Sequence, residues 1–425
     1  MRHPDRFRVT MTGNGADAGG SGAPSLTVTS LRQRNTALAL RQIIIAGQTT
    51  RANLARDCNL SMASITNIVA DLMADGLVAE TGSVASRGGR PITLLEPEPE
   101  GSYFIGADVG ERGVAVELFD LRMTMIDREF RGGRAEEDPE AIARDLDDAV
   151  RNLSERNPEA MARLVGIGLA LPGVVETAEG GEQTLYAQSL GWPPVRVRDL
   201  IDRDLTIFAE NGAKTMARAE MWFGAARGAD HAVVALLGRG VGLGVVSDGV
   251  LQGGTMSSAY EWGHTKIERH GRSCRCGGTG CVEAYIGADA ILAAWADAGG
   301  RFEGSGWGAI GRLLEADEQG DAVAQAVVAD LLVSLGAALG GLVNLLNPQR
   351  VIVGGWVGLR LMESLAPRIE QAIRDAALVR AGSQFELHTS AFGGDSVALG
   401  AALLPLEALI SQPRAVLDLR QTGLG

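Results

Sequence analysis

The feature that most constrains this chain is a short cysteine-rich stretch, GHTKIERHGRSCRCGGTGCVEAY, at residues 263–285. Three of the four cysteines lie here, at Cys274, Cys276 and Cys281, and His264 precedes them. Thiolates and an imidazole are the ligands that a tetrahedral structural zinc ion prefers, and glycines let a short loop fold around the ion. The stretch therefore predicts a zinc site formed by one histidine and three cysteines.

Two alternatives to a metal site stay open. The loop could hold reduced cysteines without an ion, or two of the cysteines could form a disulfide. A disulfide fits less well, because three cysteines leave one unpaired and nothing marks the chain as secreted. Since no apolar segment follows the early arginines, we expect no signal peptide and a cytoplasmic protein with reduced thiols. The long apolar run at residues 331–346 predicts a buried helix rather than a membrane span.

Charge is distributed unevenly along the chain. The whole chain has a net charge of −13, which excludes a global basic field for nucleic acid. Residues 28–97, in contrast, contain seven arginines and five acidic residues. A mildly basic segment is therefore joined to an acidic body, and any nucleic acid contact is expected in that segment.

The basic segment, residues 28–97, predicts a winged helix-turn-helix. We expect helices at residues 31–46 and 51–58, and a third helix that Ser61 caps and Gly76 ends. Thr50 is the expected cap of the second helix, and two strands at 77–80 and 92–95 flank a loop at 81–91. The third helix has apolar residues at helical spacing on one face, namely Ile65, Ile68, Val69, Leu72 and Met73.

The other face of the third helix is the candidate DNA-reading surface. Short and polar side chains near its N-terminus fit a major groove, and arginines in the following loop could reach a minor groove or the backbone. The predicted DNA-contacting residues are Arg51, Ser61, Met62, Ser64, Thr66, Asn67, Arg87 and Arg90. A small three-helix domain that binds protein is the alternative. Residues 1–27, rich in Gly, Ser, Ala and Asp, predict a disordered tail.

From residue 98 onward, strands alternate with helices, which predicts two α/β lobes with a cleft between them. The expected strands are 103–109, 114–118, 164–170, 205–209, 231–237, 241–247 and 351–353, with helices at 139–153 and after Asn211 up to Phe223. We expect a first lobe at 98–229, a second lobe with the cysteine loop at 230–392, and a C-terminal helix that returns to the first lobe at 393–425.

Several motifs resemble the ROK family of repressors and sugar kinases. These are Glu261-Trp262-Gly263-His264 followed by CRCGGTGCVE, the L-R-x-x-N opening at residues 31–35, and G-G-R-P in the loop. The resemblance covers about residues 28–410 and implies an actin-like, hexokinase-type ATPase fold behind the winged helix-turn-helix. It also implies a zinc site at the histidine and cysteines, and sugar contacts from Asn211, Glu261, His264 and Glu283.

The kinase motifs of that family are altered in this chain. The first phosphate turn, with Asp108 and Gly110, has Glu and Arg where Gly and Thr are usual. The second keeps its glycines, Gly238, Gly240 and Gly242, but again has Arg for Thr. Gly212 replaces the general base Asp, whose loss typically costs about 100- to 10,000-fold in rate. We therefore expect no catalytic residues and no ATP requirement. The alternative is a sugar kinase in which Glu210 serves as a displaced base.

The sugar side also departs from the family. Ser189 stands where Asn is usual, and Ser257 and Tyr260 replace glycines. Tyr260 is expected to fill part of the pocket or to stack on a sugar ring. A third possibility besides sensor and kinase is a zinc-stabilised protein-interaction module without a ligand.

Together these features predict a sugar-responsive transcriptional regulator, most simply a repressor of a carbohydrate-utilisation operon. We expect it to bind a double-stranded operator with an inverted repeat, as a homodimer or homotetramer and without membrane contact. A sugar in the cleft would shift DNA affinity only by binding two states differently.

Overall fold

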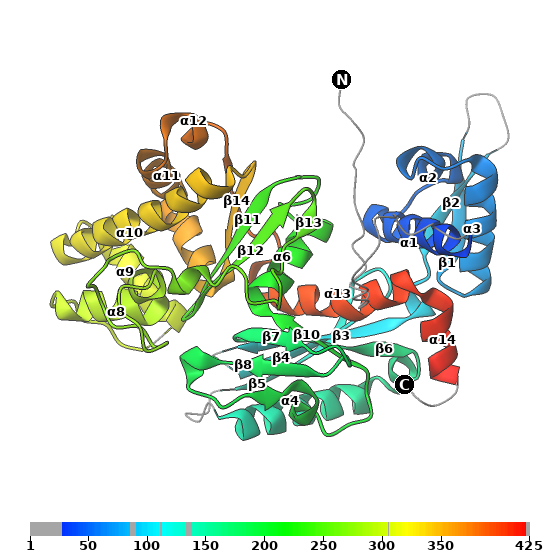
Figure 1. Ribbon diagram of the computed structural model, residues 1–425, viewed down its shortest axis with the longest axis horizontal. Helices are drawn as coiled ribbons and strands as arrows, with labels where there is room; N and C mark the ends of the chain where they lie inside the picture. Colours follow the sequence, from blue (N-terminus) through cyan, green and yellow to red (C-terminus); the bar gives the residue numbers. More distant parts are fainter. Residues whose placement is uncertain (1–27, 86–90, 111–112, 133–137, 305, 422–425) are drawn as a thin grey trace, which may run out of the picture.

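The computed structural model describes residues 28–421 apart from residues 86–90, 111–112, 133–137 and 305 (Figure 1). The predicted tail at 1–27 and the predicted DNA contacts Arg87 and Arg90 lie outside the described residues.

The N-terminal segment forms three helices and a hairpin. They are α1 (Val28–Ala46), α2 (Arg51–Asp57), α3 (Met62–Ala74), and the antiparallel strands β1 (Val78–Val84) and β2 (Ile92–Pro97). Thr50 caps α2 by accepting from the Asn53 N–H, and Ser61 caps α3 by accepting from the Ser64 N–H, so both predicted caps are confirmed. The predicted end of the first strand at residue 80 was wrong, because β1 pairs with β2 as far as Val84.

Packing of α3 follows its apolar spacing with one exception. Ile65, Ile68, Val69 and Leu72 are buried, but Met73 is 37% exposed, so its place in the predicted apolar face was wrong. Met73 lies in the last turn of α3. Cys58 is buried as a small apolar residue.

A first lobe is built on a five-stranded sheet of order β10-β6-β3-β4-β5. Its strands are β3 (Tyr103–Gly110), β4 (Gly113–Phe119), β5 (Met125–Gly132), β6 (Leu164–Leu171) and β10 (Ile207–Asn211). The helix α4 (Pro139–Arg156) covers one face, and α13 (Ser396–Ser411) lies on the other against β3 and β6 (Figure 1). The expected strand 205–209 is displaced by two residues, since β10 pairs with β6 from Ile207 to Asn211.

A second five-stranded sheet, of order β13-β12-β11-β14-β15, forms the other lobe. The long helices α10 (Ala322–Leu346) and α11 (Gly355–Ala376) pack on each other beside it. The other strands and helices of this lobe are β11 (Ala232–Leu237), β12 (Val241–Ser247), β13 (Val250–Leu251), β14 (Arg350–Gly354), β15 (Glu386–Thr389), α7 (Glu283–Ile286), α8 (Ala288–Asp297), α9 (Gly306–Glu318) and α12 (Val379–Gly382).

The remaining helices and strands join these parts. A small sheet of β7 (Val174–Thr177), β8 (Gln183–Tyr186) and β9 (Val195–Arg196) extends the first lobe, and α5 (Pro158–Met161) precedes β6. The helix α6 (Gly212–Phe223) packs against both β12 and α13, and α14 (Pro413–Gln421) follows α13. Short 3-10 turns at Gln188–Leu190, Trp262–His264 and Gly393–Asp395 border the space between the lobes.

Two helices, Ala322–Leu346 and Gly393–Ser411, are long and apolar enough to cross a membrane by length and composition. Two thirds of each apolar window, 67%, is buried inside the protein. Their apolar character is therefore accounted for by packing in the two lobes, as predicted for residues 331–346.

Candidate functional site

The predicted metal ligands come together. One ligand atom from each of His264, Cys274, Cys276 and Cys281 lies within 4.8 Å of the others. The Nδ1 of His264 is 3.7 Å from Cys274 Sγ, and the Sγ atoms of Cys276 and Cys281 are 3.8 Å apart. Four ligands about 2.3 Å from a tetrahedral ion would have sulfur atoms about 3.8 Å apart. A disulfide bond of about 2.05 Å is excluded by the same separation.

Glycines allow the tight backbone of the cysteine loop, and a lysine lies beside one of its sulfur atoms. Gly277 and Gly280 have φ values of 87° and 69°, and a Cβ at Gly280 would lie 1.7 Å from the carbonyl oxygen of Glu268. Only glycine fits this crossing of two chain segments. Lys266 Nζ lies 2.9 Å from Cys281 Sγ, so a cationic side chain borders the predicted ligands.

Beside this loop, a cavity of about 560 Å³ lies between the lobes. The strands β3 and β6 contribute to one wall, and β11 and β12 to the other. Every predicted sugar-contacting residue and every glycine-turn residue lines it: Asn211, Glu261, His264, Glu283, Asp108, Gly110, Gly238, Gly240 and Gly242. The sequence motifs therefore converge on a single cleft.

His264 links the metal loop to the first lobe. While Nδ1 faces Cys274, Nε2 lies 3.2 Å from the hydroxyl of Ser189. If Nδ1 holds a metal ion, the proton is on Nε2 and the imidazole donates to Ser189. Gln188 makes a second bridge, because its Nε2 donates to the Cys276 carbonyl at 2.9 Å. The two lobes are thus in contact beside the cleft through the metal loop.

Two carboxylates line the cleft close to His264. Burial raises the pKa of Glu261, and the nearby His264 and Lys214 only partly oppose this effect. The carboxyl oxygens of Glu261 can accept hydrogen bonds, which suits a ligand hydroxyl. Glu283 is buried, accepts from the Val241 N–H at 3.1 Å, and lies 3.6 Å from Arg275.

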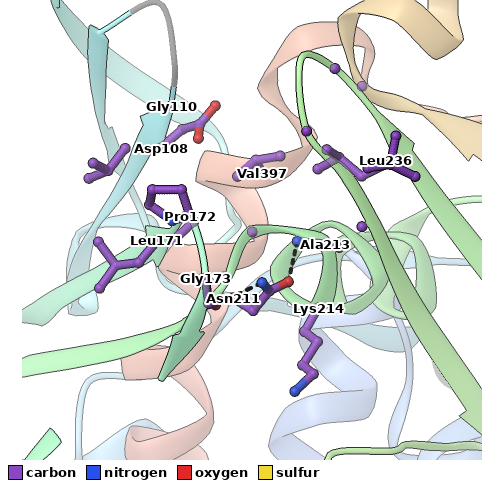
Figure 2. Close-up of a pocket in the computed structure, with 18 of the residues that line it drawn as sticks. Asp108, Gly110, Leu171, Pro172, Gly173, Asn211, Ala213, Lys214, Leu236 and Val397 are labelled. Atoms are coloured by element: carbon purple, nitrogen blue, oxygen red, sulfur yellow. Dashed lines mark hydrogen bonds between the residues drawn. The ribbon is translucent and has the colours of Figure 1, made fainter. Parts of the chain in front are cut away.

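Asn211 caps α6, whose first residue is Gly212. Figure 2 shows Asn211 beside Ala213. The Asn211 side chain accepts from the Ala213 N–H at 2.9 Å and donates to the Gly173 carbonyl at 2.8 Å. One amide hydrogen and one lone pair are left for a ligand by this count. Glu210, the alternative base, accepts from Ser257 Oγ at 3.0 Å and from the Asn211 N–H at 2.9 Å.

The sequence analysis missed Lys214, a buried cation next to this motif. Its ammonium group donates to the carbonyl and hydroxyl of Ser257 and lies 3.9 Å from Glu210. Burial lowers the pKa of Lys214, and the carboxylates of Glu210 and Glu261 oppose the shift. Glu210 lies in β10 and Lys214 in the first turn of α6, so the pair forms across the strand-to-helix turn and no helical spacing indicates it.

Ser257 and Tyr260 have backbone conformations that glycine adopts more readily than other residues. Their φ values are 56° and 70°, in the left-handed region. Tyr260 lines the cleft and packs partly against the core of the second lobe. Of these two residues, Ser257 is held in this conformation by its hydrogen bonds with Lys214 and Glu210.

The second glycine turn has structural reasons for its glycines. A Cβ at Gly242 would lie 2.7 Å from Ala213 Cβ, so β12 can approach α6 only with glycine there. A Cβ at Gly238 would lie 3.3 Å from Trp356 Nε1, which places the indole on this turn. Arg239 pairs with Asp289 at 2.8 Å and borders a separate cavity. These glycines therefore need no nucleotide to explain them.

Five of the predicted DNA-contacting residues lie at the start of α3, and Arg51 is the first residue of α2. Ser61, Met62, Thr66 and Asn67 are exposed at the start of α3, and Ser64 is half-buried. Arg51 pairs with Glu80 at 2.7 Å, so it also fastens α2 to β1.

A contact between the N-terminal segment and the cleft helices was also missed. The Arg41 guanidinium of α1 lies 4.7 Å from the ring centroid of Trp222 in α6. Trp222 donates to Glu407 of α13 at 3.0 Å, and Arg218 of α6 pairs with the same carboxylate. One buried core contains residues of α1, α3, α6 and α13. The N-terminal segment is therefore packed directly on the two helices that begin at the cleft.

The chain is similar to known proteins over most of its length. A sequence model described as the ROK family matches residues 104–408. The xylose repressor of Caldicellulosiruptor bescii is 26% identical over 91% of this chain and 98% of that protein. The DNA-binding transcriptional repressor Mlc of Escherichia coli is 26% identical over 89% of this chain and 94% of that protein. The E. coli dual regulator NagC is 27% identical over 82% of this chain and 86% of that protein.

Two solved structures extend the comparison. A ROK family transcriptional regulator, a homologue of the E. coli Mlc protein, aligns with a TM-score of 0.73 at 25% identity. It covers 91% of this chain and 99% of that structure. A ROK family glucokinase from Streptomyces griseus, in complex with glucose and AMPPNP, aligns with a TM-score of 0.62 at 25% identity. The alignment covers 71% of this chain and 99% of that structure. The predicted fold class, a helix-turn-helix segment followed by the two-lobed actin-like fold, is thereby confirmed.

Proposed function

The chain belongs to the ROK family, and from this premise we propose that it is a DNA-binding transcriptional regulator whose two-lobed body senses a sugar. The observation that carries the proposal is the continuity of α6 and α13. Each helix begins at the cleft, and each ends in the core that it shares with α1. A ligand that alters the cleft can therefore act directly on the DNA-binding segment.

DNA contact is assigned to the start of α3. Its exposed residues are short and mostly polar, as a helix entering the major groove requires. Met62 is 50% exposed there, although it is apolar, and is suited to contact with a thymine methyl group. The relatives named as repressors bear the same family assignment, and we extend DNA binding to this chain from them.

In the cleft, Glu261, His264 and Glu283 would contact sugar hydroxyls, and the remaining hydrogen-bond capacity of Asn211 would add to them. These groups offer both donors and acceptors, which a polyhydroxylated ligand needs. Such a ligand would alter the bridge from Ser189 to the metal loop, because it competes for the same His264 nitrogen. Closure of the lobes would then depend on the ligand.

The metal of the cysteine loop is proposed to be zinc, held by His264, Cys274, Cys276 and Cys281. Three sulfur ligands and one imidazole with no open position are typical of a structural zinc site. The ion would fix the loop, and His264 would present its second nitrogen to the cleft.

Kinase activity is not part of the proposal. Gly212 offers no proton acceptor, and Glu210 is engaged by Ser257 and by the backbone. Trp356 lies on the second glycine turn, where a nucleotide phosphate would have to approach. These features argue against the sugar kinase alternative, even though kinases share the fold.

The proposal also includes the location of the protein, its operator, its oligomeric state and its domain limits. We propose a cytoplasmic repressor of a carbohydrate-utilisation operon that binds an inverted repeat as a homodimer or homotetramer. The domain limits at residues 97, 229 and 392 are kept as proposed, and each falls between two secondary-structure elements.

The proposal is tested by selecting binding sites for the full chain from a randomised double-stranded DNA library, followed by fluorescence anisotropy. We expect an enriched inverted repeat. Asn67→Ala should weaken binding about tenfold or more, because a bidentate base contact is worth about 1–3 kcal/mol. The matched control is Met73→Ala, at the far end of α3, which should bind like the unmodified chain. Failure to enrich any sequence would refute the proposal.

A further inference from the structure

The cleft is larger than one sugar ring requires. Its volume of about 560 Å³ is within the range of sites that bind ligands of drug size. It is one continuous cavity, which reaches from His264 and Glu261 at the metal loop to Trp356 at the start of α11. A monosaccharide at the polar end would leave the other half unfilled.

The other half begins at Gly212, next to Asn211, and is lined mainly by apolar side chains. Figure 2 shows Leu171 and Pro172 on one side of the cavity, Leu236 on the opposite side and Val397 between them. Trp356 adds an indole that lies on the Gly238 turn. Aromatic and aliphatic surfaces of this kind gain free energy from burying an apolar group.

Charges in the same half disfavour a phosphate group. Asp108 and Glu117 line the cavity, and neither oxygen of Glu117 accepts a hydrogen bond within the part of the chain that the structure describes. Arg128 lies 3.3 Å from Glu117 and 3.1 Å from Asp395, so its charge is already matched. An added anion would have to compete with these carboxylates.

Cations elsewhere on the described cleft wall are also engaged. Lys214 is held by Ser257, and Arg275 lies 3.6 Å from Glu283. Arg239, although it belongs to the glycine turn, pairs with Asp289 and borders the other cavity. The described residues thus supply an apolar surface beside cations that Ser257 or carboxylates already hold, which fits an uncharged group.

We infer that the cleft binds a glycoside, with its sugar ring at Glu261, His264 and Glu283 and an uncharged, apolar aglycone between Leu171, Leu236, Trp356 and Val397. The inference deepens the proposed function and rests on its assignment of the sugar end. It distinguishes an apolar glycoside from a free monosaccharide, a sugar phosphate and a nucleotide.

The test measures direct binding to the full chain by isothermal titration calorimetry, without DNA. The probes are 4-nitrophenyl and methyl glycosides of glucose, galactose, mannose, xylose and N-acetylglucosamine, with glucose 6-phosphate and ATP for comparison. For at least one sugar, the nitrophenyl glycoside should bind at least tenfold more tightly than its methyl counterpart. The phosphate and the nucleotide should show no binding at the same concentrations.

Two variants assign the preference to the apolar half. Leu236→Ala and Val397→Ala should each reduce the advantage of the nitrophenyl glycoside several-fold and leave the methyl glycoside unchanged. Val333→Ala, on the exposed side of α10, is the matched control and should change neither. Because each variant is compared by a ratio of two ligands, a general loss of folded protein would not imitate the result.

Three outcomes would overturn the inference: equal affinity for nitrophenyl and methyl glycosides, tighter binding of the sugar phosphate, or no binding of any glycoside. Each is distinguishable from failure of the proposed function, which is measured separately by sequence-specific DNA binding. A chain that binds an operator but no glycoside would refute the inference alone.

Discussion

Trp222 and Glu407 join the two helices that connect the cleft to the DNA-binding segment, because the indole N–H donates to the carboxylate at 3.0 Å. Arg41 of α1 lies over the same indole ring. Arg414 of α14 lies 3.5 Å from Asp71 of α3, which adds a contact from the C-terminal helix to the DNA-reading helix. Movement of α6 or α13 at the cleft would therefore displace α1 and α3.

Trp222→Phe should weaken the coupling between ligand and DNA. The substitution replaces the indole with a smaller aromatic ring and removes the N–H that donates to Glu407. Allosteric couplings are typically worth about 1–3 kcal/mol, or about 5- to 150-fold in affinity. In this variant we expect the ligand to change operator affinity by less than about threefold, which is below the range of typical couplings. Operator titrations with and without a bound glycoside measure it.

Two further variants complete that experiment. Glu407→Gln removes the charge that Arg218 needs and should have the same effect. Glu363→Gln removes an exposed partner of Arg360 on α11, far from this junction, and should leave the coupling intact. An unchanged ligand response in both Trp222→Phe and Glu407→Gln would exclude this route.

Cys276→Ser should reduce bound zinc. Full chain purified without chelator should contain about one zinc ion per chain, and the variant much less, because a hydroxyl is a poor substitute for a thiolate ligand. Inductively coupled plasma mass spectrometry gives the stoichiometry, and thermal unfolding should show a lower Tm. Cys58→Ala is the matched control, since Cys58 lies in the N-terminal segment. Equal zinc content in Cys276→Ser and the unmodified chain would contradict the assignment.

Glu117 should make stability depend on pH. Burial raises the pKa of Glu117 to about 7 from an ordinary value of 4.5, helped by Asp395 and opposed by Arg128. Because the folded state binds this proton more tightly, its contribution is complete below about pH 4.5 and is lost as the pH rises through 7. The free energy of unfolding falls by at most about 3 kcal/mol over this pH range because of Glu117.

The comparison is between the Tm at pH 5.5 and the Tm at pH 8.0. The unmodified chain should lose several degrees more than Glu117→Gln over this interval, because glutamine does not titrate. Glu363→Gln serves as an exposed control and should behave like the unmodified chain. Identical pH profiles for Glu117→Gln and the unmodified chain would show that Glu117 is not the titrating group.

Gly212→Asp should not restore sugar phosphorylation. A Cβ at this position meets only Val397 Cγ1 at 3.8 Å and the Leu171 carbonyl at 4.0 Å, so the side chain fits. A restored base alone would supply about 100- to 10,000-fold. We expect ATP turnover to stay at background, because Trp356 still lies on the glycine turn. Gly212→Asn is the control, and turnover that appears only with aspartate would show that a complete nucleotide site persists.

Local features of the sequence predicted most of the site. The caps Thr50 and Ser61 depend on neighbouring residues, and the cysteine spacing confines the metal ligands to one loop. Motifs along the chain also indicated which residues line the cleft. Each of these signals lies within a short stretch of the sequence or within a family motif.

Long-range packing was not predictable in the same way. β5 alternates exposed and half-buried residues at a sheet edge, so its apolar signal is weak. The orientation of Arg239 away from the cleft depends on Asp289, fifty residues later. Similarly, the junction of Arg41, Trp222 and Glu407 joins three distant segments, and no pattern within any one of them indicates the others.

The central claim is that a ligand in the cleft changes the affinity of α3 for DNA. The most direct measurement is the dissociation constant of the full chain for its selected operator, by fluorescence anisotropy, with and without saturating nitrophenyl glycoside. We predict a change of at least about fivefold, the lower end of typical allosteric couplings. An operator affinity that stays the same while calorimetry shows the glycoside bound would contradict the account.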